Sequence, residues 1–136
     1  MSGQKIKRTK LLFLSFCGLF LLPTIGCGHF KSPSTVVHSV YMDCNNGEYP
    51  KARHLFTQDL RAQSDGSLEA NGLGIKMVCD RLTNSGSITE VDIKGETIRG
   101  DRATVVADVQ FNSGATRSGE RTDLVREDGV WKVALQ

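Results

Sequence analysis

The pattern of apolar positions divides the chain after residue 32 into a helical part and a strand part. From 33 to 82, apolar side chains recur every three to four residues, which is the period of an amphipathic helix. From 87 onward they alternate with polar side chains, which is the period of a strand. Helices followed by strands are typical of the α+β class, in which the helices pack on one face of an antiparallel sheet.

Three helices are predicted in the first part. The first begins at Pro33, behind the capping oxygen of Ser32, and ends at the Asn-Asn-Gly sequence of 45–47. The second is short and begins at Pro50, with Leu55 and Phe56 turned inward. The third follows a polar turn and begins after Ser67.

Four strands are predicted in the second part, joined by tight turns into an antiparallel meander. One face of the first strand carries Thr89, Val91 and Ile93. Gly95 is a predicted bulge in that strand. The second strand has the clearest alternation, with apolar side chains at every other position over 103–111. The third strand covers about 116–126, and the last strand carries Trp131.

Three stretches support one fold in particular. They are VHSVYMDCNNGEY at 37–49, GDRATV at 100–105 and LVREDGVWKV at 124–133. They resemble small exported domains with the nuclear transport factor 2-like (cystatin-like) fold, and among them a group of bacterial lipoproteins with a domain of unknown function. The resemblance covers most of residues 33–135. It implies three helices packed on a curved four-stranded antiparallel sheet, often around a cavity, and it implies no particular activity.

The start of the chain has the layout of an export signal. Four basic residues precede the apolar run Leu11–Leu22, and Pro23 ends that run. Twelve residues are too few to cross a bilayer, which takes about 20. The exit Thr24-Ile25-Gly26-Cys27 resembles the lipobox of bacterial lipoproteins, although Thr24 stands where the family usually has Leu.

The lipobox resemblance implies cleavage before Cys27 and attachment of fatty-acyl chains, palmitate among them, to its thiol. The expected organisation is a signal peptide over 1–26, a lipidated tether over 27–32 and one folded domain over 33–136. A plain secreted form and an uncleaved membrane anchor are the alternatives. By resemblance to Gram-negative sorting, Gly28 implies the outer membrane of a cell envelope that has one.

Removal of the signal changes the charge of the protein. It takes away four of the seventeen basic residues and none of the fifteen acidic ones, so residues 27–136 carry a formal charge of −2. No polybasic block remains in this part. A nucleic-acid partner is therefore not expected, and steering toward anionic lipid is expected to be weak.

Two cysteines remain once Cys17 leaves with the signal and Cys27 takes lipid. An even pair in an exported domain is compatible with a disulfide between Cys44 and Cys79. Two buried thiols are the alternative, because both cysteines lie on apolar helix faces. Without a CxxC or a paired His, these cysteines predict no metal site, and no cofactor is expected.

Four side chains deserve consideration as catalytic groups: Tyr41, His54, Asp92 and Asp108. Both aspartates are out of phase with the apolar face of their strands, so they are expected to face solvent. Tyr41 lies on the apolar stripe of the first helix and is expected in the core with its hydroxyl hydrogen-bonded. No general base with a matched acid can be named, and no catalytic residue is assigned.

The expected function is that of a membrane-anchored, non-catalytic module that binds an envelope protein or a small apolar ligand. If the fold holds a cavity, Tyr41, Phe56 and Trp131 are the residues expected to line it. The alternative is a small cavity-based enzyme that uses Tyr41 or His54. A homodimer packed through its sheet faces is a third hypothesis.

Overall fold

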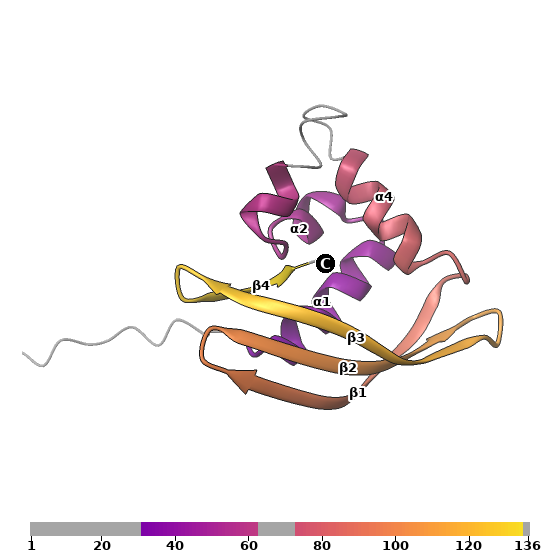
Figure 1. Ribbon diagram of the computed structural model, residues 1–136. Coiled ribbons are helices and arrows are strands. Elements are labelled where there is room, and N and C mark those ends of the chain that lie inside the picture. Colours follow the sequence, from indigo (N-terminus) through magenta and orange to yellow (C-terminus); the bar gives the residue numbers. More distant parts are fainter. Residues whose placement is uncertain (1–30, 63–72, 135–136) are drawn as a thin grey trace, which may run out of the picture.

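A computed structural model describes residues 31–62 and 73–134 of the chain. Its labelled helices are α1 (Pro33–Asn45), α2 (Tyr49–Arg53) and α4 (Leu73–Leu82). Its strands are β1 (Ile88–Arg99), β2 (Arg102–Phe111), β3 (Thr116–Glu127) and β4 (Val130–Ala134). The helices precede the strands along the chain, as the change of apolar period predicts (Figure 1).

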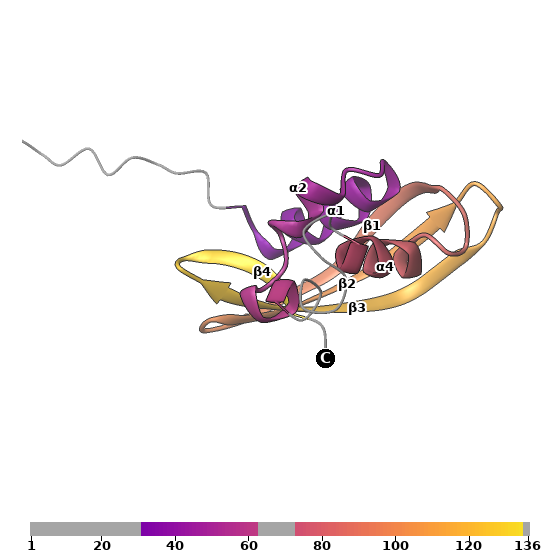
Figure 2. The same cartoon turned by 90° about the horizontal axis from the view of Figure 1, so that it is seen from above.

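The four strands form one antiparallel sheet in the order β1-β2-β3-β4. The helices gather on one face of this sheet, and the other face is left to the strands alone (Figures 1 and 2). The predicted α+β class and four-stranded antiparallel sheet are therefore confirmed.

A short segment after α2 lies against the outer edge of β4. The amide of Val133 donates to the carbonyl of Leu55 at 2.8 Å, and the amide of Thr57 donates to the carbonyl of Val133 at 3.0 Å. Phe56, between them, forms a parallel bridge with Val133. Phe56 was expected on the second helix, but α2 ends at Arg53, so this side chain reaches the core from a bridge instead.

The core lies between α1 and the covered face of the sheet. Every second residue of β2 is buried, namely Ala103, Val105, Ala107, Val109 and Phe111, which confirms the predicted alternation. A disulfide joins Cys44 of α1 to Cys79 of α4. The helices α1 and α4 are therefore linked covalently.

Residues of β1 form hydrogen bonds with both ends of α1. At its start, the Ser32 hydroxyl accepts from the amide of Thr35, and the Glu96 carboxylate of β1 accepts from the amide of Ser34 at 2.9 Å. At its end, the side chain of Asn45 accepts from the amide of Ile88 at 2.7 Å and donates to the carbonyl of Ile88. Glu96 thus satisfies one backbone amide that the start of a helix leaves without a partner, and the Asn45 side chain ties the other end of α1 to the first residue of β1.

The structure differs from the expected elements at two places. Residues 58–62 are helical, so a polar stretch that the apolar period did not mark adds to the three predicted helices. The predicted start of the third helix after Ser67 lies outside the described residues. In β1 a register shift between Ile88 and Glu90 turns Ile88, and not Thr89, toward the core. The irregularity expected at Gly95 is present.

Candidate functional site

A small cavity lies between the helices and the covered face of the sheet. Its volume is about 30 Å³, which leaves room for about one water molecule. Pockets for small ligands measure roughly 300–1,000 Å³. The cavity is lined by Val37, Val40, Tyr41, Phe56, Val78, Leu82, Thr122 and Val133. Tyr41 and Phe56 thus lie on its wall as the sequence suggested, but side chains fill most of the space.

Tyr41 brings a polar group to this wall. Burial and then the negative charge of Glu120 raise the pKa of Tyr41, while Arg117 and a hydrogen bond with Thr122 lower it. The net effect is a pKa above the ordinary value of 10.0. Tyr41 is therefore a neutral phenol near pH 7, which can donate a hydrogen bond but is poorly suited to act as a base.

Arg117 of β3, near Tyr41, is engaged with the end of α4. Its guanidinium donates to the carbonyls of Leu82 and Arg81, the latter at 3.4 Å, and lies 4.9 Å from the centroid of the Phe111 ring. A positive charge is favourable at the carbonyl end of a helix. Arg117 therefore has a structural role in joining the sheet to α4.

His54 and Trp131 lie away from the cavity. His54 is exposed at the end of α2, and its backbone carbonyl accepts a hydrogen bond from the Lys132 ammonium. Trp131 was expected on the cavity wall, but it is not among the lining residues. Its buried ring instead packs beneath the Arg126 guanidinium, 4.4 Å from the ring centroid.

The two strand aspartates lie on the face of the sheet opposite the helices, as their phase predicts. Asp92 and Asp108 are register partners, and Lys94 pairs with both, at 3.8 Å from the carboxylate of Asp108. Asp108 also accepts from the amide of Gly119 at 2.8 Å, beside a register shift in β3. Both aspartates therefore have partners within the sheet.

The predicted lipid site at Cys27 lies outside the described residues. Within the described residues, no helix combines the length and the apolar character that a membrane crossing requires. Over the same ranges, His, Cys, Asp and Glu form no group of three or more that could hold a metal ion.

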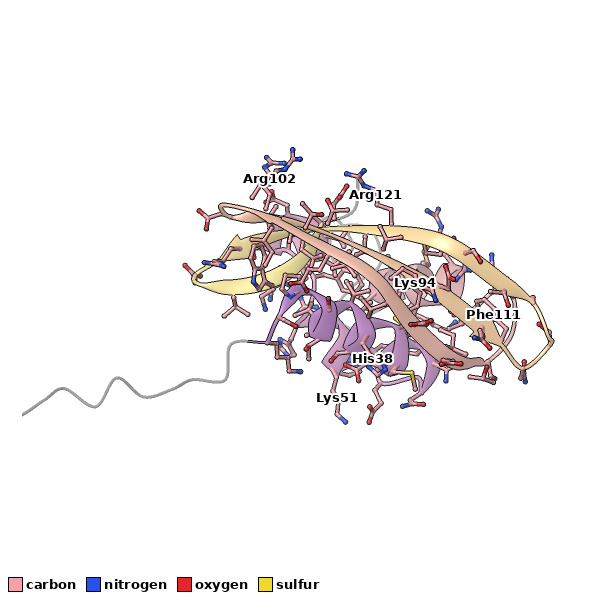
Figure 3. The ribbon with its side chains drawn as sticks, turned by 90° about the horizontal axis from the view of Figure 1, so that it is seen from below. His38, Lys51, Lys94, Arg102, Phe111 and Arg121 are labelled. Carbon is pink, nitrogen blue, oxygen red and sulfur yellow. A yellow bond between two sulfur atoms is a disulfide. The ribbon has the colours of Figure 1, made fainter. Side chains whose placement is uncertain are left out.

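A much larger hollow lies on the face of the sheet opposite the helices. Its volume is about 580 Å³, within the range of ligand pockets. Arg99, Arg102 and Arg121 line it from three successive strands. The other lining residues are Thr97, Ala103, Thr104, Val106, Asp123, Leu124, Val125 and Ala134. Figure 3 shows Arg102 and Arg121 projecting from the sheet on the side away from the helices. We call this site the arginine hollow.

One acidic side chain lies among the residues that line the arginine hollow. Asp123 accepts a hydrogen bond from the Thr104 hydroxyl at 2.7 Å and pairs with Arg121 at 3.2 Å. The Thr104 bond first, and then the charges of Arg121 and Arg102, lower the pKa of Asp123. With Asp123 ionised, three arginines face one carboxylate, so the lining residues carry excess positive charge.

The arginine hollow could not be recognised from the sequence. Arg99 and Arg102 flank the tight turn between the first two strands, and Arg121 lies in a strand with few apolar positions. The register brings them together, because Arg99 pairs with Arg102 across the hairpin and Arg121 pairs with Val106. The available signal was the phase of the strands, which puts Arg102 and Arg121 opposite the apolar set, together with the bulge at Gly95, which brings Arg99 to the same face.

Comparisons with known proteins agree with this architecture. A family model described as "Domain of unknown function (DUF4878)" matches residues 25–134. No curated protein matches the chain. The chain is similar to the crystal structure of a Campylobacter jejuni protein described as a candidate NTF2-like transpeptidase, with a TM-score of 0.59 and 17% identity over 78% of this chain and 100% of that one.

A second similar structure is that of a SEC-C motif containing protein from Rhodopseudomonas palustris. Its TM-score is 0.56, with 19% identity over 76% of each chain. At these identities the likeness concerns the fold and not the activity. The predicted nuclear transport factor 2-like fold is therefore confirmed.

Proposed function

The chain belongs to the DUF4878 family of domains of unknown function, and we propose that it is a lipid-anchored envelope protein with a non-catalytic binding domain. The domain binds through the face of its sheet that the helices leave open. One observation carries this proposal: the interior cavity measures about 30 Å³, whereas the arginine hollow on the open face measures about 580 Å³.

The small interior cavity and the exposed position of His54 favour a binding role over a catalytic one. A cavity-based enzyme would have to bring its substrate to Tyr41 or His54. Tyr41 faces a space for about one water molecule, and His54 is exposed on the surface away from that space. An envelope protein or a small ligand can instead reach the open face without any rearrangement of the core.

The disulfide supports the proposed compartment. Disulfides persist in oxidising surroundings outside the cytosol and are rare within it. The bond between Cys44 and Cys79 therefore agrees with an exported domain. A fatty-acylated Cys27 would then hold that domain at a membrane surface, since two or three acyl chains give stable anchoring.

Metabolic labelling tests the anchor. Cells that express the full chain are grown with an alkyne analogue of palmitate, and the purified protein is examined for the label. We expect label on the wild-type chain and none on Cys27→Ser. A wild-type protein without label would contradict the anchoring.

Site-specific cross-linking tests the binding face. A photoreactive amino acid is placed at Thr97, which lines the arginine hollow, or at Met77, which is exposed on α4. We expect adducts with an envelope component in intact cells from position 97 and fewer from position 77. Equal adducts at the two positions, or none at 97, would argue against binding through the open face.

A further inference from the structure

We propose that the arginine hollow docks the domain onto phosphate headgroups of anionic lipids in the membrane that holds its anchor. This inference rests on the proposed lipid anchoring and adds the chemical class that the open face recognises. Three features carry it: the position of the hollow relative to the start of α1, the length of the tether and the charge of the lining residues.

The tether enters the fold at the end of the sheet that carries the hollow. The Glu96 carboxylate on β1 bonds to Ser34 in the first turn of α1. Arg99 follows Glu96 by three residues, or about 10 Å along an extended strand, and pairs with Arg102 across the hairpin. The start of α1 and two of the three arginines therefore lie at the same end of the domain.

The short tether keeps this end close to the bilayer. Residues 27–32 form six links between the acylated cysteine and Pro33, and six residues extend at most about 20 Å. A domain held this closely returns to the surface continually, so the effective concentration of headgroups around it is high. The arginines need only act over short distances.

The charges of the hollow suit a phosphate anion. Each guanidinium offers a planar fork of donors that matches phosphate oxygens. Asp123 is occupied by Thr104 and Arg121 and leaves an excess of positive charge among the lining residues. Screening limits charge interactions to about 8–10 Å in salt. A formal charge of −2 on residues 27–136 gives no long-range attraction to an anionic surface, so the anchor must act first.

The residues that line the arginine hollow also favour a lipid over a free anion as the ligand. Val106, Val125 and Ala134 lie among the arginines and offer apolar surface. A phospholipid brings a phosphate together with glycerol and acyl carbons, and both kinds of lining would then have a partner. A free phosphate would leave the apolar part of the hollow in contact with water.

Arginine footprinting on vesicles tests the inference. The lipidated full-length product is added to vesicles of phosphatidylcholine with or without phosphatidylglycerol, and phenylglyoxal modification is measured by mass spectrometry. We expect modification of Arg99, Arg102 and Arg121 to slow about fivefold or more on the anionic vesicles. Arg81, exposed on α4, serves as the internal control and should react equally on both.

Two variants carry the same loss of charge on opposite faces. The first combines Arg99→Gln, Arg102→Gln and Arg121→Gln, and the second combines Lys51→Gln, Lys76→Gln and Arg81→Gln on the helices. Hydrogen exchange of the β1–β2 hairpin should depend on phosphatidylglycerol in the wild type and in the helix variant. It should lose that dependence in the arginine variant.

Each contrary outcome has its own meaning. Equal modification of the three arginines on both vesicles overturns the inference. Protection by inorganic phosphate on neutral vesicles also overturns it, because the hollow would then bind a soluble anion. The mass of the N-terminal peptide is measured beforehand, and a peptide without acyl chains would overturn the proposed anchoring instead.

Discussion

The two faces of the sheet are built from the same strands but differ in what covers them. On the covered face, β2 buries every second side chain, and the helices leave a cavity of about 30 Å³. On the open face, the intervening side chains of the same strand help to line a hollow of about 580 Å³. The helices cover most of one face, so we expect a partner to bind at the other face without disturbing the core.

The charged side chains on the two faces also differ in their contacts. On the covered face, Glu96 bonds to the start of α1, and Arg117 donates to the carbonyls at the end of α4. On the open face, Arg99, Arg102 and Arg121 line the hollow. The comparison teaches that a charge in this fold is informative about binding only after its helix contacts are known.

Loss of the disulfide between α1 and α4 should have the largest effect on the free energy of unfolding. We expect Cys44→Ala combined with Cys79→Ala to lower the free energy of unfolding by about 3–4 kcal/mol, because the closed loop no longer restricts the unfolded chain. The sequence separation of the pair is 35 residues. Urea denaturation of the purified protein measures the change.

A reducing agent supplies the control for this prediction. It should destabilise the wild type by a similar amount and leave the double alanine variant unchanged. An identical urea midpoint for the wild type with and without reductant would show that the bond does not contribute.

Adjacent valines of β2 allow the two faces to be compared with a single kind of substitution. Val105 is fully buried on the covered face, and Val106 lines the arginine hollow. We expect Val105→Ala to cost about 2 kcal/mol, from lost burial and the space left behind, and Val106→Ala to cost less than about 1 kcal/mol. Both lose the same β-branched side chain, so the difference in urea midpoints isolates burial. Equal costs would contradict the division of the faces.

Features that depend only on neighbouring residues, such as the buried face of β2 and the start of α1, could be predicted from the sequence. Strict alternation over 103–111 gives both the strand and its buried face, because a strand directs successive side chains to opposite sides. The Ser32-Pro33 pair likewise gives the start of α1, since these residues suit the N-cap and the first helical position.

Features that depend on contacts between residues far apart in the sequence could not be predicted. Phe56 leaves the helical pattern because its neighbours bond to Val133, which is 77 residues away in sequence. The volume of the interior cavity depends on how all the side chains pack together. The spacing of apolar residues therefore could not predict that the expected cavity is nearly filled. The arginines of the hollow come from separate strands, and only the register brings them together.

The contact between Glu96 and α1 should have a smaller effect than either substitution in the core. We expect Glu96→Gln to lower the free energy of unfolding by about 0.5–1 kcal/mol, because the negative charge at the helix start is lost. Glu90→Gln on the same strand is the matched control. Glu90 is exposed and pairs with Gln110 on the open face, so its substitution should change the urea midpoint little. A similar small change in both variants would mean that the contact with Ser34 contributes nothing.

The smallest effect is expected at Asp123, where stability and binding should move in opposite directions. Its folded-state pKa is lowered from the ordinary value of 3.8. The resulting stabilisation is therefore fully present above that ordinary value and is lost as pH falls through the lower folded-state pKa.

Asp123→Asn should remove this pH dependence together with the charge. We expect it to lower the free energy of unfolding by no more than about 0.5 kcal/mol at pH 6, as for an exposed ion pair, and the difference from the wild type should shrink at pH 3. Loss of the carboxylate leaves the three arginines without an opposing charge among the lining residues. On phosphatidylglycerol vesicles, protection of Arg102 from phenylglyoxal should consequently increase. Weaker protection in the asparagine variant would mean that Asp123 positions the arginines, and not that it offsets their charge.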